Sequence, residues 1–250
     1  MKKLCLILSA LTVLFVTPAF SSTSDSLRAA ATQGKLVFMI VTAPDTQGVD
    51  QVRSTLEQAQ AITPGSIILE LDRTDPAEAT LVRKYRLATA PVPLVLVFDS
   101  NGILCSGRPG VGLNTVKVLS MVPSQSKSRV LKALQSHKAV LVTAYRKGMK
   151  MKDSVSACCK SASDKLAGKC ESVLVNMDDT REFNFLRELK IDRESVEPVT
   201  VVINAKAQVT GKFAGPVQLT TLVAAATRQP RKSCCGSGSG KSCGPAGSSK

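Results

Sequence analysis

The chain has 250 residues, with 33 Lys or Arg, 19 Asp or Glu and a formal net charge of +14. Such a surface favours anionic partners, but the basic residues are scattered, and only seven Phe, two Tyr and no Trp accompany them. This composition excludes a row of aromatic side chains on which nucleic-acid bases stack. We therefore interpret the positive charge as solvated surface and expect no nucleic-acid partner. The length suits one large domain or two small ones.

The first 21 residues have the organisation of a secretory signal peptide. Two lysines precede an apolar run at 4–16 that is too short to span a bilayer. The small residues Ala19 and Ser21 then suit a cleavage site between Ser21 and Ser22. An uncleaved membrane anchor is the alternative, which the shortness of the run disfavours. We expect the mature chain to begin at Ser22, to carry no transmembrane segment, and to be periplasmic or secreted.

The next hundred residues alternate between strand and helix patterns. Continuous apolar runs predict buried strands, and apolar residues at helical spacing predict helices. Proline is expected at the first position of a strand because it cannot donate to a sheet ladder. The predicted elements are a helix at 22–33, a strand at 36–41, a helix at 48–62, a strand at 67–72, a helix at 75–86, strands at 93–98 and 103–104, and a helix at 112–121.

The same order of elements starts again after a short polar stretch at 123–127, which we interpret as a linker. The matching pairs Leu71/Met177 and Pro93/Pro198 are 106 and 105 residues apart. A common offset over several elements is typical of an internal repeat. The second set of predicted elements is a helix at 128–136, a strand at 139–144, a helix at 152–167, a strand at 173–177, a helix at 180–189, strands at 198–203 and 208–209, and a helix at 216–227.

Local motifs also occur at matching places in the two halves. In the first half, Leu69-Glu70-Leu71-Asp72-Arg73-Thr74-Asp75-Pro76 and the pair Lys84-Tyr85 precede the strand that begins at Pro93. In the second half, Gly168-Lys169 and Val175-Asn176-Met177-Asp178 stand at the same place. These motifs resemble the second core strand of thioredoxin and the region that follows it.

The resemblance covers residues 30–122 and 128–227. It implies an α/β fold with two tandem thioredoxin-like domains, each a central mixed sheet flanked by helices. It also implies cis peptide bonds before Pro93 and Pro198, with ordinary trans bonds as the alternative. The chain then divides into a signal peptide at 1–21, a first thioredoxin-like domain at 22–122, a linker at 123–127, a second thioredoxin-like domain at 128–227, and a tail rich in Cys, Gly and Ser at 228–250.

Thioredoxins exchange disulfides through a Cys-x-x-Cys motif at the start of their first long helix, where the helix N-terminus lowers the thiol pKa. This chain has no Cys-x-x-Cys at any position. The corresponding positions fall near Gly48 and Gln51 in the first half, and near Met149 and Lys152 in the second. None of these residues carries a thiol, so we expect no disulfide exchange at either place, and an enzymatic role stays an open question.

Three cysteines lie in the second half, at Cys158, Cys159 and Cys170. A Cys158–Cys170 disulfide is disfavoured, because the helical rise puts Cys158 about 13 Å from the end of its predicted helix, whereas bridged Cα atoms lie within about 7 Å. Cys158 and Cys159 are the alternative redox residues, in a divergent thiol oxidoreductase. The lone Cys105 is expected to be a small buried residue and the only histidine, His137, a surface residue.

The stretch 228–250 contains Cys234, Cys235 and Cys243 among Gly, Ser and basic residues, without apolar periodicity. The sequence therefore predicts a disordered tail. Thiolates prefer soft or borderline metals, so we consider binding of Cu(I) or Zn(II), although three sulfurs leave a tetrahedral zinc site incomplete. Disulfides formed in an oxidising compartment, or no role, are the alternatives. We expect no other cofactor.

The resemblance also implies where a polypeptide partner binds, because family members hold extended peptide beside the cis-proline by backbone pairing. The residues concerned are Val92 and Pro93 in the first half, and Glu197 and Pro198 in the second. We therefore expect an exported protein that binds or scaffolds polypeptides, such as envelope proteins. The other two hypotheses are a divergent thiol–disulfide oxidoreductase and a carrier of soft metal.

Overall fold

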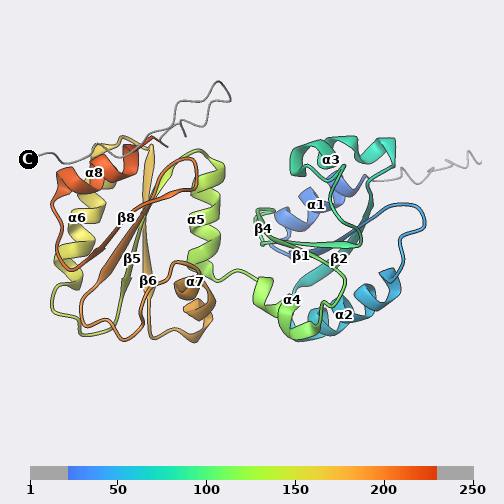
Figure 1. Cartoon of the computed structure of the whole chain (residues 1–250), viewed down its shortest axis with the longest axis horizontal. Coiled ribbons are helices and arrows are strands. Elements are labelled where there is room, and N and C mark those ends of the chain that lie inside the picture. Colours follow the sequence, from blue (N-terminus) through green and yellow to red (C-terminus); the bar gives the residue numbers. More distant parts are fainter. Residues whose placement is uncertain (1–21, 230–250) are drawn as a thin grey trace, which may run out of the picture. The chain divides into compact units, whose positions relative to one another are not determined.

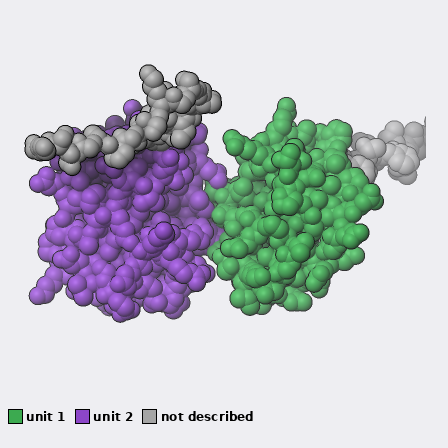
Figure 2. All heavy atoms as spheres, viewed as in Figure 1, with its two compact units in different colours: residues 1–122 green, residues 123–250 purple. Residues whose placement is uncertain are grey.

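The computed structural model of the protein describes residues 22–229, so the predicted signal peptide lies outside the described residues. The chain divides into two compact units between Val122 and Pro123, which we call unit 1 and unit 2 (Figure 2). Within residues 22–229, no helix is both long enough and apolar enough to cross a membrane.

Unit 1 alternates helices with strands. Its elements are α1 (Thr23–Thr32), β1 (Leu36–Thr42), α2 (Val49–Ile62), β2 (Ser66–Asp72), the 3-10 turn η1 (Pro76–Glu78), α3 (Ala79–Tyr85), β3 (Leu94–Phe98), β4 (Leu104–Pro109) and α4 (Thr115–Met121). The strands form one sheet in the order β2-β1-β3-β4, and Figure 1 labels β1, β2 and β4 together with the helices around them. The first two strands are parallel, and β3 is antiparallel to both β1 and β4.

Unit 2 repeats this arrangement. Its elements are α5 (Gln125–Gln135), β5 (Ala139–Tyr145), α6 (Lys152–Lys165), β6 (Cys170–Asn176), the 3-10 turn η2 (Thr180–Glu182), α7 (Phe183–Glu188), β7 (Val199–Ile203), β8 (Val209–Ala214) and α8 (Leu219–Thr227). The strand order is β6-β5-β7-β8, with a parallel β5/β6 pair and antiparallel pairs elsewhere. The prediction of an α/β fold with two thioredoxin-like domains, each a mixed sheet flanked by helices, is confirmed.

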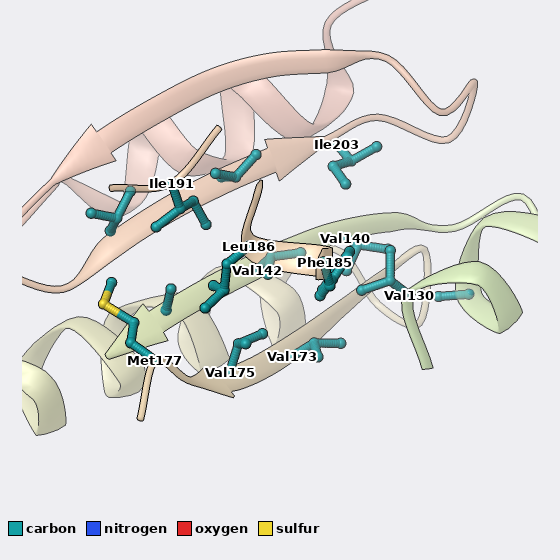
Figure 3. Packing of buried hydrophobic residues seen from close by; sticks show 14 residues of the cluster. Val130, Val140, Val142, Val173, Val175, Met177, Phe185, Leu186, Ile191 and Ile203 are labelled. Atoms are coloured by element: carbon teal, nitrogen blue, oxygen red, sulfur yellow. The ribbon is translucent and has the colours of Figure 1, made fainter. Parts of the chain in front are cut away.

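Each sheet separates two apolar cores. In unit 1, α1 and α3 cover one face and α2 and α4 cover the other. In unit 2, α5 and α7 cover one face, where Leu186 and Ile191 pack with Val142 and Val175 of the sheet (Figure 3). The opposite face is covered by α6 and α8. Strands that are covered on both faces need apolar residues at every position, which is why their sequences do not alternate.

Short polar side chains close the matching turns in both units. Asp75 Oδ1 accepts the N–H of Ala77 at 2.8 Å and Asp179 Oδ1 that of Arg181 at 3.0 Å, so each caps a 3-10 turn. The β3–β4 turn is held by Asp99, whose Oδ1 accepts two backbone N–H groups at 2.9 Å each. In unit 2, the β7–β8 turn uses Asn204 Oδ1 in the same way, at 3.0 Å for both bonds.

The units divide at the start of the predicted linker at 123–127, but the next helix begins inside that linker. Helix α5 begins at Gln125, because the hydroxyl of Ser124 accepts the N–H of Lys127 at 3.2 Å and caps the helix. Most of the predicted linker is therefore helical. In the same way Asn114 caps α4, which begins at Thr115 rather than at 112.

The C-terminal boundary of unit 2 also differs, since the predicted tail began at Arg228. The backbone N–H of Arg228 donates to Ala225 O at 3.2 Å, and its carbonyl accepts from Asn204 Nδ2 at 3.0 Å. Its guanidinium Nη1 donates to Thr210 O at 2.9 Å. These three bonds make Arg228 part of the folded unit.

The alignment of the two halves is corrected by the strand registers. Leu71 pairs with Val41 in unit 1, and Val175 pairs with Ala144 at the same place in unit 2. Leu71 therefore corresponds to Val175 rather than to Met177, an offset of 104 residues. One additional residue before β7 gives the offset of 105 at the two prolines.

Candidate functional site

In unit 1, Pro93 lies beside α2. The Val92–Pro93 bond is cis, as predicted. The carbonyl of Pro93 accepts the N–H of Gly110 at 2.7 Å. A Cβ atom on Gly110 would lie 2.6 Å from Val52 Cγ2 and 3.0 Å from Pro93 Cγ, so only glycine fits between them. The fold thus brings the loop before β3 against the first turns of α2.

The start of α2 carries no thiol. Gly48 is the N-cap residue, with a left-handed backbone at φ 77°. The loop before it is held by Thr46, whose hydroxyl donates to Ala43 O at 2.6 Å and accepts the N–H of Ala43 at 2.9 Å. Gln51, one turn into the helix, is exposed. The first turn of α2 therefore carries backbone N–H groups and an exposed amide side chain, and Val52 of the same turn lies near Pro93 across Gly110.

In unit 2, Pro198 occupies the equivalent place. Its carbonyl accepts the N–H of Gly215 at 2.8 Å, as the carbonyl of Pro93 accepts from Gly110. The predicted cis bond is wrong here, because within residues 22–229 only the Val92–Pro93 bond is cis. A trans bond is the ordinary state of an X-Pro sequence, and nothing in the residues around a proline specifies the isomer. The pairing geometry that the resemblance implied at Glu197 and Pro198 therefore differs from that in unit 1.

A groove of about 550 Å³ lies in front of Pro198, between the loop that precedes α6 and the loop that precedes β7. Val196 is 88% exposed and Met151 is 38% exposed. Met149 packs against the core, and its Sδ accepts the N–H of Arg146 at 3.2 Å. The groove is lined by Arg146, Lys147, Gly148, Met149, Lys150, Met151, Ser195, Val196, Glu197 and Pro198.

Charged side chains of both signs surround this groove. The guanidinium of Arg146 lies 3.2 Å from Glu194 Oε1 and 3.8 Å from Asp178 Oδ1. Lys152 Nζ lies 4.5 Å from the centroid of the Tyr145 ring, a cation–π contact. The lining itself carries three basic side chains, Arg146, Lys147 and Lys150, and one acid, Glu197, beside its apolar side chains.

Part of this groove was predictable from the sequence and part was not. The loop position of Met149 follows from the strand that ends at Tyr145. The exposure of Val196 was missed, and the available signal was a single apolar residue between Ser195 and Glu197 in an otherwise polar loop. One isolated valine carries too little information to predict a groove, because single exposed apolar residues are common on protein surfaces.

The cysteines of unit 2 lie away from the groove. The Cys158 thiol donates to Val217 O at 3.3 Å, and burial, together with the neighbouring Cys159, raises its pKa. Cys159 is fully buried, and burial raises the pKa of Cys170 to about 11. Neither Cys158, Cys159 nor Cys170 forms a disulfide. A catalytic thiol needs a lowered pKa and access to its substrate, so the raised pKa of Cys158 and the burial of Cys159 oppose the alternative redox site.

Candidate metal ligands fall into two groups. Cys234, Cys235 and Cys243 lie outside the described residues, so the predicted tail site has no structural description. Within residues 22–229, no three His, Cys, Asp or Glu side chains are grouped so that they could hold a metal ion. His137 is exposed at the end of α5, and Cys105 donates to Ile103 O at 3.1 Å.

The sheets and the two proline sites define a class of protein: two thioredoxin-like units with no cysteine pair at either site. No family model and no curated protein matches the chain. Among solved structures, the first two thioredoxin domains of Saccharomyces cerevisiae Eps1p match at 11% identity, covering 86% of this chain and 98% of that chain, with a TM-score of 0.33.

Two other solved structures give similar values. The zinc-bound form of human ERp44 matches at 12% identity over 80% of this chain and 55% of that chain, with a TM-score of 0.33. The germline-specific thioredoxin Deadhead of Drosophila melanogaster matches at 18% identity over 42% of this chain and 95% of that chain, with a TM-score of 0.32. At identities and TM-scores this low, the fold assignment rests on the strand order and pairing of the two sheets.

Proposed function

We propose that the protein is exported, is inactive in disulfide exchange, and binds extended segments of polypeptide partners in the cell envelope or outside the cell. The observation that carries this proposal is the groove in front of Pro198, which is lined by Met149, Met151 and Val196 and contains no thiol. When a partner covers an exposed apolar side chain such as Val196, the complex is stabilised, by about 1.5–3 kcal/mol for complete burial.

Apolar contact has a larger part in this proposal than backbone pairing. The carbonyl of Glu197 already accepts the hydroxyl of Ser195 at 2.8 Å, so an incoming peptide N–H competes for that oxygen or uses its second lone pair. Methionine side chains adapt to differently shaped partners, which suits a groove that accepts several sequences. We therefore expect a preference for segments with aliphatic or aromatic side chains and little dependence on one exact sequence.

Inactivity in disulfide exchange is proposed for both units. At the starts of α2 and α6, the residues Gly48, Gln51, Met149 and Lys152 offer no nucleophilic thiolate. We expect the mature protein to reduce insulin-type disulfides no faster than the reductant alone. Activity at the level of an ordinary thioredoxin that is lost in Cys158→Ser would support the oxidoreductase hypothesis instead.

The groove is tested by titrating the protein with a reduced, carboxymethylated unfolded protein while following fluorescence anisotropy. Val196→Asp should weaken binding about tenfold or more, because it replaces the exposed apolar contact by a solvated charge. The matched control is Val209→Asp, since Val209 is 59% exposed but pairs with Ile203 at the other end of β7. Equal affinities of the two variants would contradict the assignment of the groove.

A further inference from the structure

Glu78, the last residue of η1, is a buried acid, and one of its carboxylate oxygens has no hydrogen-bond partner within residues 22–229. The side chain is only 6% exposed, and its Oε1 accepts the N–H of Thr23, the first residue of α1, at 2.8 Å. Its other oxygen, Oε2, is buried and has no hydrogen-bond partner within residues 22–229. A buried carboxylate oxygen without a partner is costly, and each such group in a folded protein calls for an explanation.

The internal repeat shows what the second oxygen does when it is satisfied. Glu182 stands at the same place in unit 2, where its Oε1 accepts the N–H of Ser126 at 3.3 Å. Its Oε2 accepts the hydroxyl of Ser124 at 2.5 Å. Thr23 and Ser126 correspond, because their hydroxyls donate to the carbonyls of Glu70 and Leu174 on the equivalent strands β2 and β6, at 3.2 and 3.5 Å. The position that matches Ser124 is Ser21, which lies outside the described residues, so within residues 22–229 unit 1 has no counterpart of the Ser124 hydroxyl.

The missing donor belongs just before Thr23, where the predicted signal peptide ends. Cleavage between Ser21 and Ser22 would convert the backbone nitrogen of Ser22 from an amide with one proton into an ammonium group with three. One residue spans at most about 3.6 Å, so this nitrogen lies within reach of the carboxylate that already binds the N–H of Thr23. We propose that Glu78 is the binding site for the new N-terminus, and that Oε2 pairs with the α-ammonium group of Ser22 in the processed protein.

The charge of the helix favours a negative partner for the new N-terminus. An ammonium group at the N-terminus of α1 meets the positive end of the helix dipole, which is unfavourable. The charged side chains on the elements around Ser22 are Asp25 and Arg28 on α1, Glu70 on β2 and Asp75 on η1. Asp25 Oδ1 lies 3.3 Å from Arg28 Nη1 and its Oδ2 accepts the hydroxyl of Ser22 at 3.0 Å, Glu70 is bound to Arg53 at 2.7 Å, and Asp75 caps η1. Among these acids, Glu78 is the one with a buried oxygen that has no partner within residues 22–229.

The consequence is that processing stabilises unit 1. The precursor has an amide rather than an ammonium group at Ser22, and Oε2 of Glu78 has no partner within residues 22–229, so cleavage adds a donor beside an unpaired oxygen. A carboxylate neighbour raises the pKa of an amine above its ordinary range of about 7.7–8.0. The stabilisation is therefore complete below about pH 8 and is lost as the pH rises through the raised pKa of the amine.

The experiment compares the mature chain 22–250 with a free amine and the same chain acetylated at Ser22, by urea unfolding at pH 6. The free form should have a folding equilibrium constant about tenfold larger than the acetylated form, corresponding to one unit of pKa. In Glu78→Gln, which keeps an acceptor for Thr23, the free form should be no more stable than the acetylated one. The matched control Glu182→Gln should retain the wild-type difference.

Two measurements need no variant. N-terminal sequencing of the exported protein should give Ser22, and NMR titration of the mature wild type should give an amine pKa above 8. A different mature N-terminus, an amine pKa at or below its ordinary range, equal stabilities of the free and acetylated wild type, or a difference that survives in Glu78→Gln would each overturn the proposal.

Discussion

At the scale of single residues, the two units differ in the polarity of three buried side chains. Thr143 and Thr200 face each other on β5 and β7, with 3.4 Å between their hydroxyl oxygens. The Thr143 hydroxyl lies 3.3 Å from Cys159 Sγ, and that sulfur lies 3.7 Å from Thr200 Oγ1. The corresponding residues of unit 1 are Ile40, Leu56 and Val95. A small polar cluster therefore replaces an apolar contact in the centre of unit 2.

This cluster leads to a prediction about coupling. Thr143→Val and Thr200→Val should each lower the free energy of unfolding by about 1–2 kcal/mol, because each leaves a buried hydroxyl or thiol with fewer partners. In the double variant, the free energy of unfolding should fall by less than the sum of the two single losses, since both hydroxyls are then replaced by methyl groups. Urea unfolding of the four proteins measures the coupling, and strictly additive losses would show that the hydroxyls do not depend on each other.

At the scale of elements, the pattern of apolar residues was sufficient to predict the strands and most helices. Strands such as β3 are buried at every position, and a continuous apolar run leaves few alternatives. The boundaries were less predictable because they depend on caps such as Ser124 and Asn114. The isomer at Pro198 and the exposure of Val196 were not predictable, since each depends on how two loops that are distant in the sequence meet.

Gly110 allows the close approach of Val52 and Pro93 in unit 1, and its substitution tests whether this approach is required. Gly110→Ala should destabilise the protein by about 1–3 kcal/mol, because the new methyl group would overlap Val52 and the Pro93 ring. Ser100→Ala, at an exposed position in the same unit, is the control and should change stability by less than about 0.5 kcal/mol. Thermal unfolding of the three proteins is the measurement, and a fully stable Gly110→Ala protein would show that the close approach is not required.

At the scale of the whole molecule, two units of one fold divide the chain, and each has its own pair of cores. Their proline sites are not copies. Unit 1 has a cis bond before Pro93, whereas unit 2 has a trans bond before Pro198 and the apolar groove in front of it. The repeat thus preserves the scaffold and varies the site, which is the pattern expected when function resides in loops carried by a rigid fold.

The predicted tail is tested by removing residues 230–250, which leaves the hydrogen bonds of Arg228 in place. The truncated protein should keep its free energy of unfolding, because no side chain of the described cores is removed. It should lose any Cu(I) or Zn(II) binding and any disulfide-linked dimer that depends on Cys234, Cys235 or Cys243. Metal analysis that finds full binding after truncation would place the site elsewhere in the chain.

The measurement that tests the central claim most directly is methyl NMR of the mature protein during titration with an extended apolar peptide. The account predicts that the largest shift changes fall on Met149, Met151 and Val196, which line the groove in front of Pro198. Methyl groups at the opposite end of β7 and β8, such as that of Val209, should remain unchanged. Shift changes that are absent from the groove, or that are confined to another surface, would contradict the account.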